Sequence, residues 1–445
     1  MRVVLLNPPA AATVFRDGYC SSSSKSGYCW HPLDLVVQSG ILTGFGHDVA
    51  LIDAIALRLS PEETLRRVDA HRPDALLALA GDVSFATDAP FLNRLNVPRL
   101  LLSGDVPRFE TARTFREVPA LDAVVADFTT DGVHRFLEGE ARPEGLHMRT
   151  GGLTMPTART WSSPPARHDL LSRRAYRLPF HGAQPFASVL ASYGCPFACT
   201  FCNTGALGFR TRAAAEVLEE LRYVRRLGYR RLYLRDATAN GKRAHFLELL
   251  RAWAREDLGL AWNAFCTFQP FDAELARAMA AAGCAVVQFG VETGSAALRA
   301  ETGKAFTNEA AEAAVRYAHE AGLRVCGHFV LGLPGQDVED VQRTAEFARH
   351  LDLDWASFNL ASARPGTPLR ARADAAGIGG GDASGDGFIE GLASVSAAEL
   401  RRLRREAIVR FYLRPRPLRA LLPDLSRREG WTHLRATALA VARSF

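Results

Sequence analysis

The chain has 445 residues, a formal net charge of +6 and a pI near 9.0, with 48% hydrophobic and 23% charged residues. These values are ordinary for folded globular domains and exclude a disordered or fibrous chain, while the length exceeds what one hydrophobic core usually organises. The 54 Lys and Arg residues are interspersed with 48 Asp and Glu residues, so no basic tract favours a nucleic-acid partner.

No stretch of the sequence is apolar over the length needed to span a bilayer, and the opening MRVVLLNPPA meets prolines too early for a secretory signal. We therefore expect a cytoplasmic protein without a membrane span. The eight cysteines are then expected to be reduced thiols that include a metal site, and not a disulfide framework.

Residues 1–140 alternate short apolar runs with helical periodicity, which is typical of a doubly wound domain. The expected strands are residues 2–6, 49–52, 75–79, 99–102 and 123–125, and the expected helices are residues 33–42 and 61–69. Because such sheets are parallel, ligands are expected at the carboxyl ends of the strands. Residues 17–27 (DGYCSSSSKSG) are a polar loop after the first strand, for which we expect either a lid or a disordered segment.

Residues 141–185 show little periodicity and are predicted to be a linker. Residues 186–372 predict six strand-helix units, and hence a barrel or partial barrel whose catalytic residues follow the strands. The expected strands are residues 187–193, 231–235, 261–267, 285–291, 324–331 and 355–360, and the expected helices are residues 213–227, 243–255, 272–282, 308–321 and 338–351. Gly228, Gly283 and Gly322 stand where left-handed caps are expected. Residues 373–445 are predicted to hold a glycine-rich connector (376–387) and a basic amphipathic helix (397–413).

The segment SYGCPFACTFCN places Cys195, Cys199 and Cys202 in a Cys-x3-Cys-x2-Cys spacing directly after the first barrel strand. Three thiolates on one tight loop suit an iron-sulfur cluster or zinc, but a structural zinc site would need a fourth ligand nearby. Asn203 and Thr204 follow instead of a His or Cys. The spacing therefore predicts a cluster in which one iron has no protein ligand.

This loop resembles the signature of the radical SAM superfamily, including the aromatic Phe201 before the last cysteine. The resemblance implies a 4Fe-4S cluster whose open iron binds S-adenosylmethionine, and a reductive cleavage that releases methionine and a 5′-deoxyadenosyl radical. It also implies that the protein binds and orients the cofactor and excludes water. An external electron donor, such as flavodoxin or ferredoxin, would supply the electron.

Further segments resemble the family's S-adenosylmethionine contacts at the barrel strand ends. Asp236 (LYLRDAT) corresponds to a residue near the methionine amino group, with a turn or helix-cap aspartate as the alternative. Glu292 (FGVETGS) corresponds to an element that holds the ribose or amino end. Gly332, Pro334 and Gly335 (LGLPGQ) resemble a turn that lets backbone approach the adenine, although a plain tight turn would need the same residues.

The opening VVLLNPPA, WHPLDL and GHDVALIDA resemble the cobalamin-binding branch of this superfamily. Ser84 and Thr87 retain hydroxyls where relatives contact the cofactor, although both also suit helix caps. Gly104 keeps the first residue of a glycine pair, but Asp105 replaces the second and is a steric obstacle to a corrin ring. No Asp-x-His-x-x-Gly motif supplies a lower cobalt ligand, so the resemblance leaves cobalamin open.

The resemblance thus implies an α/β fold. A doubly wound, Rossmann-like domain of the cobalamin-binding type precedes a partial (β/α)6 TIM-like radical SAM barrel and a helical C-terminal tail. The first functional hypothesis is cobalamin-dependent C-methylation of a small molecule, such as a secondary metabolite. The alternative is a cobalamin-independent dehydration, deoxygenation, dehydrogenation or rearrangement of a small molecule such as a sugar. A third hypothesis is a non-catalytic metal-binding or nucleotide-binding protein.

Other chemically versatile residues lie in the barrel region without a motif. The sequence does not assign an acid or base, and the candidates, each with a structural role as its alternative, are His245, His328, Arg235 and Arg364. Three further cysteines lack ligand spacing and are expected to be buried, inert thiols: Cys266, Cys284 and Cys326.

Overall fold

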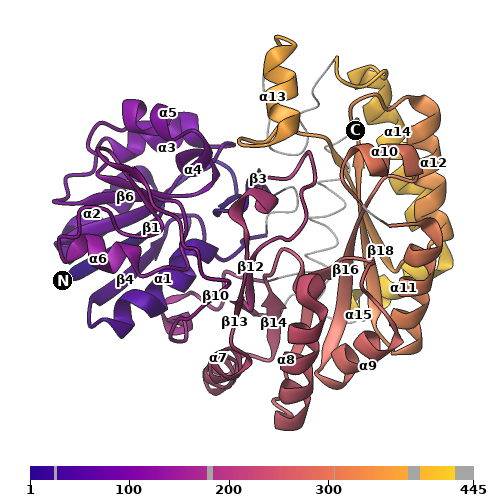
Figure 1. Cartoon of the computed structure of the whole chain (residues 1–445), viewed down its shortest axis with the longest axis horizontal. Coiled ribbons are helices and arrows are strands. Elements are labelled where there is room, and N and C mark those ends of the chain that lie inside the picture. Colours follow the sequence, from indigo (N-terminus) through magenta and orange to yellow (C-terminus); the bar gives the residue numbers. More distant parts are fainter. Residues whose placement is uncertain (25–27, 178–183, 305, 379–390, 426–445) are drawn as a thin grey trace. The chain divides into compact units, whose positions relative to one another are not determined.

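The computed structural model describes residues 1–24, 28–177, 184–304, 306–378 and 391–425 (Figure 1). The chain divides into two compact units. Unit 1 comprises Met1–Arg177 and Arg210–Gly228, and unit 2 comprises the described residues of Leu178–Phe209 and Tyr229–Phe445. Within these described ranges, no helix is both long enough and apolar enough to cross a membrane.

Unit 1 is built on a sheet with the strand order β4-β1-β5-β6-β7-β8-β9. The first five strands in this order pair in parallel and the last two in antiparallel fashion. They are β4 (Asp48–Asp53), β1 (Arg2–Asn7), β5 (Ala75–Leu79), β6 (Leu100–Ser103), β7 (Ala123–Val125), β8 (Leu146–Met148) and β9 (Gly152–Leu153). All five strands predicted in residues 1–140 are confirmed. Because the strand order reverses between β1 and β5, their carboxyl ends form the switch point at which doubly wound folds bind ligands.

Helices cover the sheet of unit 1 because successive residues of each buried strand face opposite sides. In β1, Val4 and Leu6 join a core cluster with Val68 of α2 and Phe85 of α3. The helices are α1 (Leu33–Gly44), α2 (Pro61–His71), α3 (Phe85–Leu92), α4 (Asp105–Phe109), α5 (Thr111–Glu117) and α6 (Gly132–Leu137). The two predicted helices are confirmed as α1 and α2.

The polar loop after β1 differs from its prediction. It contains an antiparallel hairpin of β2 (Val14–Arg16) and β3 (Ser21–Ser23), in which Arg16 pairs with Ser21. Arg16, Asp17 and Ser21 are almost fully buried. The expectation of a disordered segment is therefore wrong for residues 17–23, because long-range hydrogen bonds, and not local apolar patterning, order this part of the chain. The alternative of a lid stays a prediction. Residues 25–27 lie outside the described residues.

The predicted linker region also contains short elements that pack within unit 1. They are β10 (Thr160–Trp161) and the 3-10 turn η1 (His168–Leu170). Thr160 and Trp161 pair in parallel with Thr211 and Arg212 of β13 (Phe209–Arg212), which leads into α7 (Ala214–Arg226).

Unit 2 contains a six-stranded parallel sheet in the order β11-β14-β15-β16-β17-β18. The strands are β11 (Ala187–Val189), β14 (Arg231–Leu234), β15 (Ala261–Cys266), β16 (Cys284–Glu292), β17 (Arg324–Leu331) and β18 (Trp355–Leu360). Its helices are α8 (Arg243–Glu256), α9 (Ala273–Ala281), α10 (Ala296–Glu301), α11 (Asn308–Glu320) and α12 (Val338–His350) (Figure 1). The predicted succession of six strands is confirmed, and the predicted caps Gly228, Gly283 and Gly322 all have positive φ.

One predicted strand is interrupted. Residues 187–193 form β11 and a separate β12 (Ser192–Gly194), because both oxygens of Asp236 accept hydrogen bonds at the break. After β18 the chain forms α13 (Pro368–Ala375), α14 (Ala397–Tyr412) and α15 (Pro415–Leu425). The predicted amphipathic helix is confirmed as α14, and most of the predicted glycine-rich connector lies outside the described residues.

Candidate functional site

The cysteine loop follows β12 and is clamped at both ends by backbone hydrogen bonds. Cys195 N donates to Gly208 O at 3.0 Å, and Thr200 N donates to Thr302 O at 3.1 Å. Thr200 O accepts from Leu369 N at 2.9 Å. Gly194 has φ +75°, and a Cβ there would lie 1.8 Å from Gly208 O, so only glycine permits this entry into the loop.

The three thiols are partly buried on this loop. Burial raises the pKa of Cys199 to about 11, against the lowering effect of the Lys304 ammonium. Burial also raises the pKa of Cys195, whose Sγ lies 3.5 Å from Thr238 Oγ1. A metal must displace the protons of these two thiols to bind, so a cluster would ionise them.

The residues around the thiols fit an iron-sulfur cluster with an adjacent ligand. Asn203 directly follows Cys202, is 1% exposed, and has no hydrogen-bond partner for either polar atom of its side-chain amide. A buried unpaired amide is costly, so it points to a group that binds beside the loop.

Glu292 ends β16 and faces a lysine that the sequence reading missed. Its φ is +64°, which is uncommon for a residue with a side chain, and its Oε1 lies 2.9 Å from Lys304 Nζ. A Cβ at Gly290 would lie 2.5 Å from Glu292 Oε1 and 2.8 Å from Lys304 Nζ, so glycine makes room for this ion pair. Lys304 also acts electrostatically on Cys199 and Cys202. Residues 290–304 therefore place an ion pair beside the cysteine loop.

The remaining predicted S-adenosylmethionine residues have mixed environments. Asp236 is buried and accepts from Ala191 N at 2.7 Å and from Ser192 Oγ at 2.6 Å, so it braces the segment that precedes the cysteine loop. Phe201 packs against the apolar cluster of Ala363, Leu369 and Ala373. Contact of either side chain with the cofactor stays a prediction.

The turn after β17 is held by a glutamine that the motif did not single out. Gln336 Oε1 accepts from Gly332 N at 2.6 Å, while Gln336 Nε2 is buried without a hydrogen-bond partner. Gly332 and Gly335 have φ of +84° and +76°, and they flank the half-buried Pro334. The turn thus offers a buried amide donor beside backbone in a conformation that favours glycine, which is compatible with the predicted approach to adenine.

One acid-base candidate, His328, lies in a defined polar network. Its Nδ1 lies 2.8 Å from Ser357 Oγ and its Nε2 lies 3.0 Å from Gln288 Oε1. Burial, assisted by Lys304, lowers the pKa of His328 to about 4, so the ring is neutral at physiological pH. Because Gln288 Oε1 can only accept, the proton belongs on Nε2.

The other barrel candidates lie on separate elements of unit 2. Arg235 lies over the Tyr233 ring, with its guanidinium carbon 5.3 Å from the centroid. His245 lies on α8, and Arg364 lies in the turn after β18. The three other cysteines of the barrel region (Cys266, Cys284 and Cys326) are buried, as expected.

The predicted cobalamin residues of unit 1 are engaged within the chain. Ser84 Oγ accepts from Arg16 Nε at 2.8 Å and donates to Asp88 Oδ2 at 2.7 Å, and Thr87 Oγ1 donates to Ser84 O at 2.8 Å. A Cβ at Gly104 would lie 2.0 Å from Ala80 O, so this glycine serves a contact between two loops. Cobalamin does not fit among these residues in the arrangement they have here.

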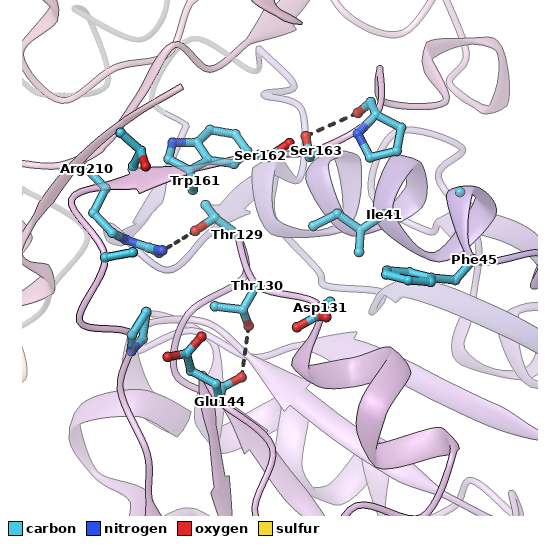
Figure 2. A pocket seen from close by; sticks show the side chains of 15 residues that line it. Ile41, Phe45, Thr129, Thr130, Asp131, Glu144, Trp161, Ser162, Ser163 and Arg210 are labelled. Atoms are coloured by element: carbon cyan, nitrogen blue, oxygen red, sulfur yellow. Dashed lines mark hydrogen bonds between the residues drawn. The ribbon is translucent and has the colours of Figure 1, made fainter. Parts of the chain in front are cut away.

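Two further features of unit 1 lie apart from these residues. A cavity of about 380 Å³ is lined by α1, the loop after β7, residues 156–164 and Arg210 (Figure 2). The Arg210 guanidinium pairs there with Asp127 and Thr129. None of the residues predicted to bind a cofactor lines this cavity.

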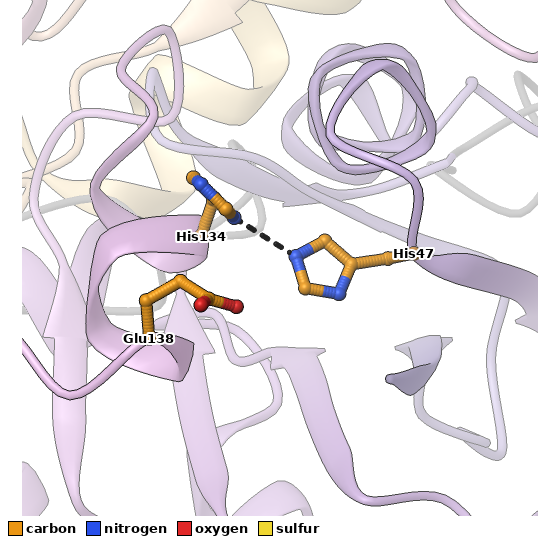
Figure 3. Close-up of side chains that lie close together, drawn as sticks. All are labelled: His47, His134 and Glu138. Carbon is orange, nitrogen blue, oxygen red and sulfur yellow. Dashed lines mark hydrogen bonds between the residues drawn. The ribbon is translucent and has the colours of Figure 1, made fainter.

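A group of possible metal ligands lies before β4 and on α6. His47, His134 and Glu138 offer ligand atoms within 4.8 Å of one another (Figure 3). His47 Nε2 and His134 Nδ1 are 3.0 Å apart and hydrogen bonded, and the His134 ring stacks on Phe45. Because His47 precedes the amino end of β4, the group lies at the edge of the sheet opposite to the predicted ligand edge.

Comparison with known proteins identifies the domain that contains the cysteine loop. Residues 189–348 match the model of the Radical SAM superfamily. An uncharacterised methyltransferase of Pyrococcus horikoshii, PH0819, is 25% identical over 98% of this chain and 97% of its own length. The cytidylyl-2-hydroxyethylphosphonate methyltransferase of Streptomyces wedmorensis is 28% identical over 44% of this chain, which spans only 39% of that protein.

Solved structures share the fold. The radical S-adenosylmethionine methyltransferase TsrM of Kitasatospora setae, with cobalamin and a 4Fe-4S cluster bound, superposes with a TM-score of 0.66 at 20% identity, covering 83% of this chain and 74% of that one. The cobalamin-dependent radical enzyme OxsB, with aqua-cobalamin and S-adenosylmethionine bound, has a TM-score of 0.72 at 13% identity, covering 98% and 72%. Residues 189–348 therefore form a radical SAM domain, the domain type of a 4Fe-4S and S-adenosylmethionine enzyme. The sequence relatives are named as methyltransferases, and the two cobalamin-containing structures share the fold of this chain.

Proposed function

We propose that this chain binds a 4Fe-4S cluster through Cys195, Cys199 and Cys202, cleaves one S-adenosylmethionine reductively to abstract hydrogen from a small molecule, and methylates that molecule at carbon with a second S-adenosylmethionine as the source of the methyl group. The observation that carries this proposal is the clamped loop with three soft donors and the orphaned amide of Asn203. The methyltransferase names of the sequence relatives support methyl transfer as the outcome. The substrate is assigned only as a small molecule.

When bound, the cluster supplies the electron that cleaves the sulfonium and yields the 5′-deoxyadenosyl radical. The chain's own residues have three tasks in this scheme. Cys195, Cys199 and Cys202 would hold the cluster through their thiolates, and a three-cysteine set would leave one iron without a protein ligand. Glu292 and Lys304 place paired charges beside the loop, where the amino and carboxylate groups of methionine need partners. The turn at Gly332 offers small residues and a buried amide. The electron comes from an external donor such as flavodoxin or ferredoxin.

A second candidate function is favoured by the filled ligand edge of unit 1. If cobalamin is absent, the same radical chemistry would lead to dehydration, dehydrogenation or rearrangement of a small molecule such as a sugar. The specific observation is that Ser84 and Gly104 are committed to contacts within the chain. We therefore derive no step of the reaction through cobalamin.

The radical activity is tested with cluster-replete protein incubated anaerobically with dithionite and S-adenosylmethionine. We expect release of 5′-deoxyadenosine, and loss of both this product and the cluster absorbance in Cys199→Ala. Cys284→Ala is the matched control, because Cys284 is buried in β16, and it should retain both. A cluster-replete protein that releases no 5′-deoxyadenosine would overturn the proposal and favour a non-catalytic protein.

Methyl transfer is tested separately with S-adenosylmethionine that carries a deuterated methyl group, incubated with candidate small-molecule substrates. A product that carries the label supports methylation. A product formed together with 5′-deoxyadenosine but without the label supports the second candidate.

A further inference from the structure

The hairpin of residues 14–23, called here the edge hairpin, covers the carboxyl ends of four parallel strands of unit 1. It contacts Asn7 at the end of β1, Ser84 after β5, Asp105 after β6 and Phe128 after β7. These strand ends form the ligand edge of a doubly wound sheet. The chain itself therefore occupies the place where a cofactor of this domain would bind.

Arg16 anchors the edge hairpin at the switch point between β1 and β5. Its guanidinium donates to Asn7 Oδ1 at 2.9 Å and to Pro8 O at 3.0 Å on the β1 side. On the β5 side it donates to Asp88 Oδ1 at 2.6 Å and to Ser84 Oγ at 2.8 Å. The Arg16 and Asp88 side chains have no exposed surface. A buried guanidinium with so many partners fixes one arrangement of this edge, since any rearrangement would leave charges unpaired.

Asp105 anchors the other strand of the edge hairpin. Its Oδ2 accepts from Ser21 N at 2.7 Å and from Ser21 Oγ at 2.8 Å, and its Oδ1 accepts from Asp82 N at 3.0 Å. The sequence marked Asp105 as an obstacle to a corrin ring. In the structure Asp105 also stabilises the edge hairpin, because its carboxylate connects β3 to the loops after β5 and β6.

Gly81 shows that the space over these strands is fitted to the edge hairpin. A Cβ at Gly81 would lie 2.6 Å from Ser21 Cβ and 3.0 Å from Arg16 Cγ. The glycine thus admits the two anchor residues of the edge hairpin. The same edge cannot also admit a ring system the size of a corrin without moving these side chains.

We propose that the edge hairpin and cobalamin exclude each other at the carboxyl edge of unit 1, so that cobalamin binds only when the edge hairpin leaves. The apparent affinity for cobalamin is then the intrinsic affinity reduced by the fraction of molecules with a displaced hairpin. This proposal concerns unit 1 alone and holds for either reaction above. Its failure would leave S-adenosylmethionine cleavage unaffected.

The test measures binding of methylcobalamin to the full-length, cluster-replete protein by equilibrium dialysis in the dark, with bound cobalt as the readout. Asp105→Gly removes the carboxylate that holds Ser21 and is expected to tighten binding at least about tenfold. Ser21→Ala removes the hydroxyl that donates to Asp105 Oδ2 and accepts from Val83 N but keeps the bond from Ser21 N to Asp105, so it should tighten binding by a smaller factor. Asp74→Asn is the matched control, because Asp74 is an exposed aspartate that pairs with Arg2, and it should bind as the unmodified chain does.

A second readout follows the edge hairpin itself. Cys20 lies in its turn and is half-buried, so its alkylation, measured by peptide mass spectrometry, should accelerate when methylcobalamin saturates the protein. Bound cobalamin with an unchanged rate of Cys20 alkylation would overturn the proposal. It would also be overturned if neither Asp105→Gly nor Ser21→Ala binds methylcobalamin more tightly than the unmodified chain, including the case in which none of the three binds.

Discussion

Glu292 combines a positive φ, a glycine neighbour and an ion pair to Lys304 beside the thiol loop. A residue used only for packing would need none of these features. Backbone strain of this kind is retained where the surroundings fix it, and it is common at functional sites. The carboxylate is therefore expected to contribute to cofactor binding through its charge.

Glu292→Gln keeps the shape of this side chain and removes its charge. We expect the iron content to be unchanged and the KM for S-adenosylmethionine to rise about tenfold, because hydrogen bonds to a charged group contribute about 1.5–3 kcal/mol. The measurements are iron analysis and the initial rate of 5′-deoxyadenosine release. Glu301→Gln, a change at an exposed glutamate of α10, is the control. Loss of iron at an unchanged KM would instead assign Glu292 to holding the loop.

Asp34 is a second residue with a clear energetic consequence. Burial, reinforced by the nearby Asp17 charge, raises the pKa of Asp34 to about 7, against the hydrogen bonds from Ser103 Oγ and Gly18 N. The folded state thus holds this proton more tightly than the unfolded state, in which an aspartate has a pKa of about 3.9. The free energy of unfolding therefore falls as the pH rises from about 4 to 7, and the whole penalty is present above that range.

Asp34→Asn should remove this penalty, since the amide oxygen can accept from Gly18 N and the amide nitrogen can donate to Ser103 Oγ. The variant is expected to be more stable than the unmodified chain at pH 8, and the difference in Tm should shrink towards pH 5. Thermal unfolding at several pH values tests this. Equal slopes of Tm against pH in the two proteins would show that Asp34 does not titrate in this range.

At the scale of elements, the linker residues are held on α7 by a buried charge network. His168 Nε2 lies 2.8 Å from Glu220 Oε1, and Arg212 pairs with the other oxygen of Glu220 while donating to Ser163 O at 2.9 Å. Burial acts to raise the pKa of Glu220, but the charges and hydrogen bonds of Arg212 and His168 outweigh it and lower the pKa to about 2. Glu220 is therefore ionised and central to this attachment.

Glu220→Gln would leave Arg212 buried without a full counter-charge. Removing one partner of a buried ion pair lowers the free energy of unfolding by about 3–5 kcal/mol. We therefore expect the first thermal unfolding transition to occur at a lower temperature and residues 160–170 to be cleaved faster by a protease. Glu219→Gln is the matched control, because Glu219 is next to Glu220 on α7 but its side chain is exposed. Equal effects of the two substitutions would contradict a role of the network.

The strands of the two larger sheets could be predicted because they form continuous apolar runs, as in residues 75–79, or alternate buried apolar with less buried polar residues, as in residues 356–360. The edge hairpin could not be predicted this way. Its serines and charged residues give no apolar period, and its order comes from partners such as Asp88, which lies 72 positions from Arg16 in the sequence. The role of Lys304 could not be predicted for a related reason. The motif around Glu292 ends before residue 304, where the chain comes back to the cysteine loop.

At the scale of the whole molecule, the two groups of candidate cofactor residues belong to different units. The three cysteines and Glu292 lie in unit 2, while Ser84, Asp105 and the edge hairpin lie in unit 1. The seven-stranded sheet lies in unit 1 and the six-stranded sheet in unit 2. Iron binding and cobalamin binding are therefore expected to respond to different substitutions.

This independence predicts the metal content of three proteins purified anaerobically in the presence of methylcobalamin. The unmodified chain should contain about four irons and little cobalt, since a cubane cluster has four irons and the edge hairpin competes with the corrin. Cys199→Ala should lose the iron without a change in cobalt, and Asp105→Gly should gain cobalt without a change in iron. Elemental analysis with visible spectroscopy measures both. Joint loss of iron and cobalt in Cys199→Ala would contradict the independence, and zinc in place of iron would contradict the cluster assignment.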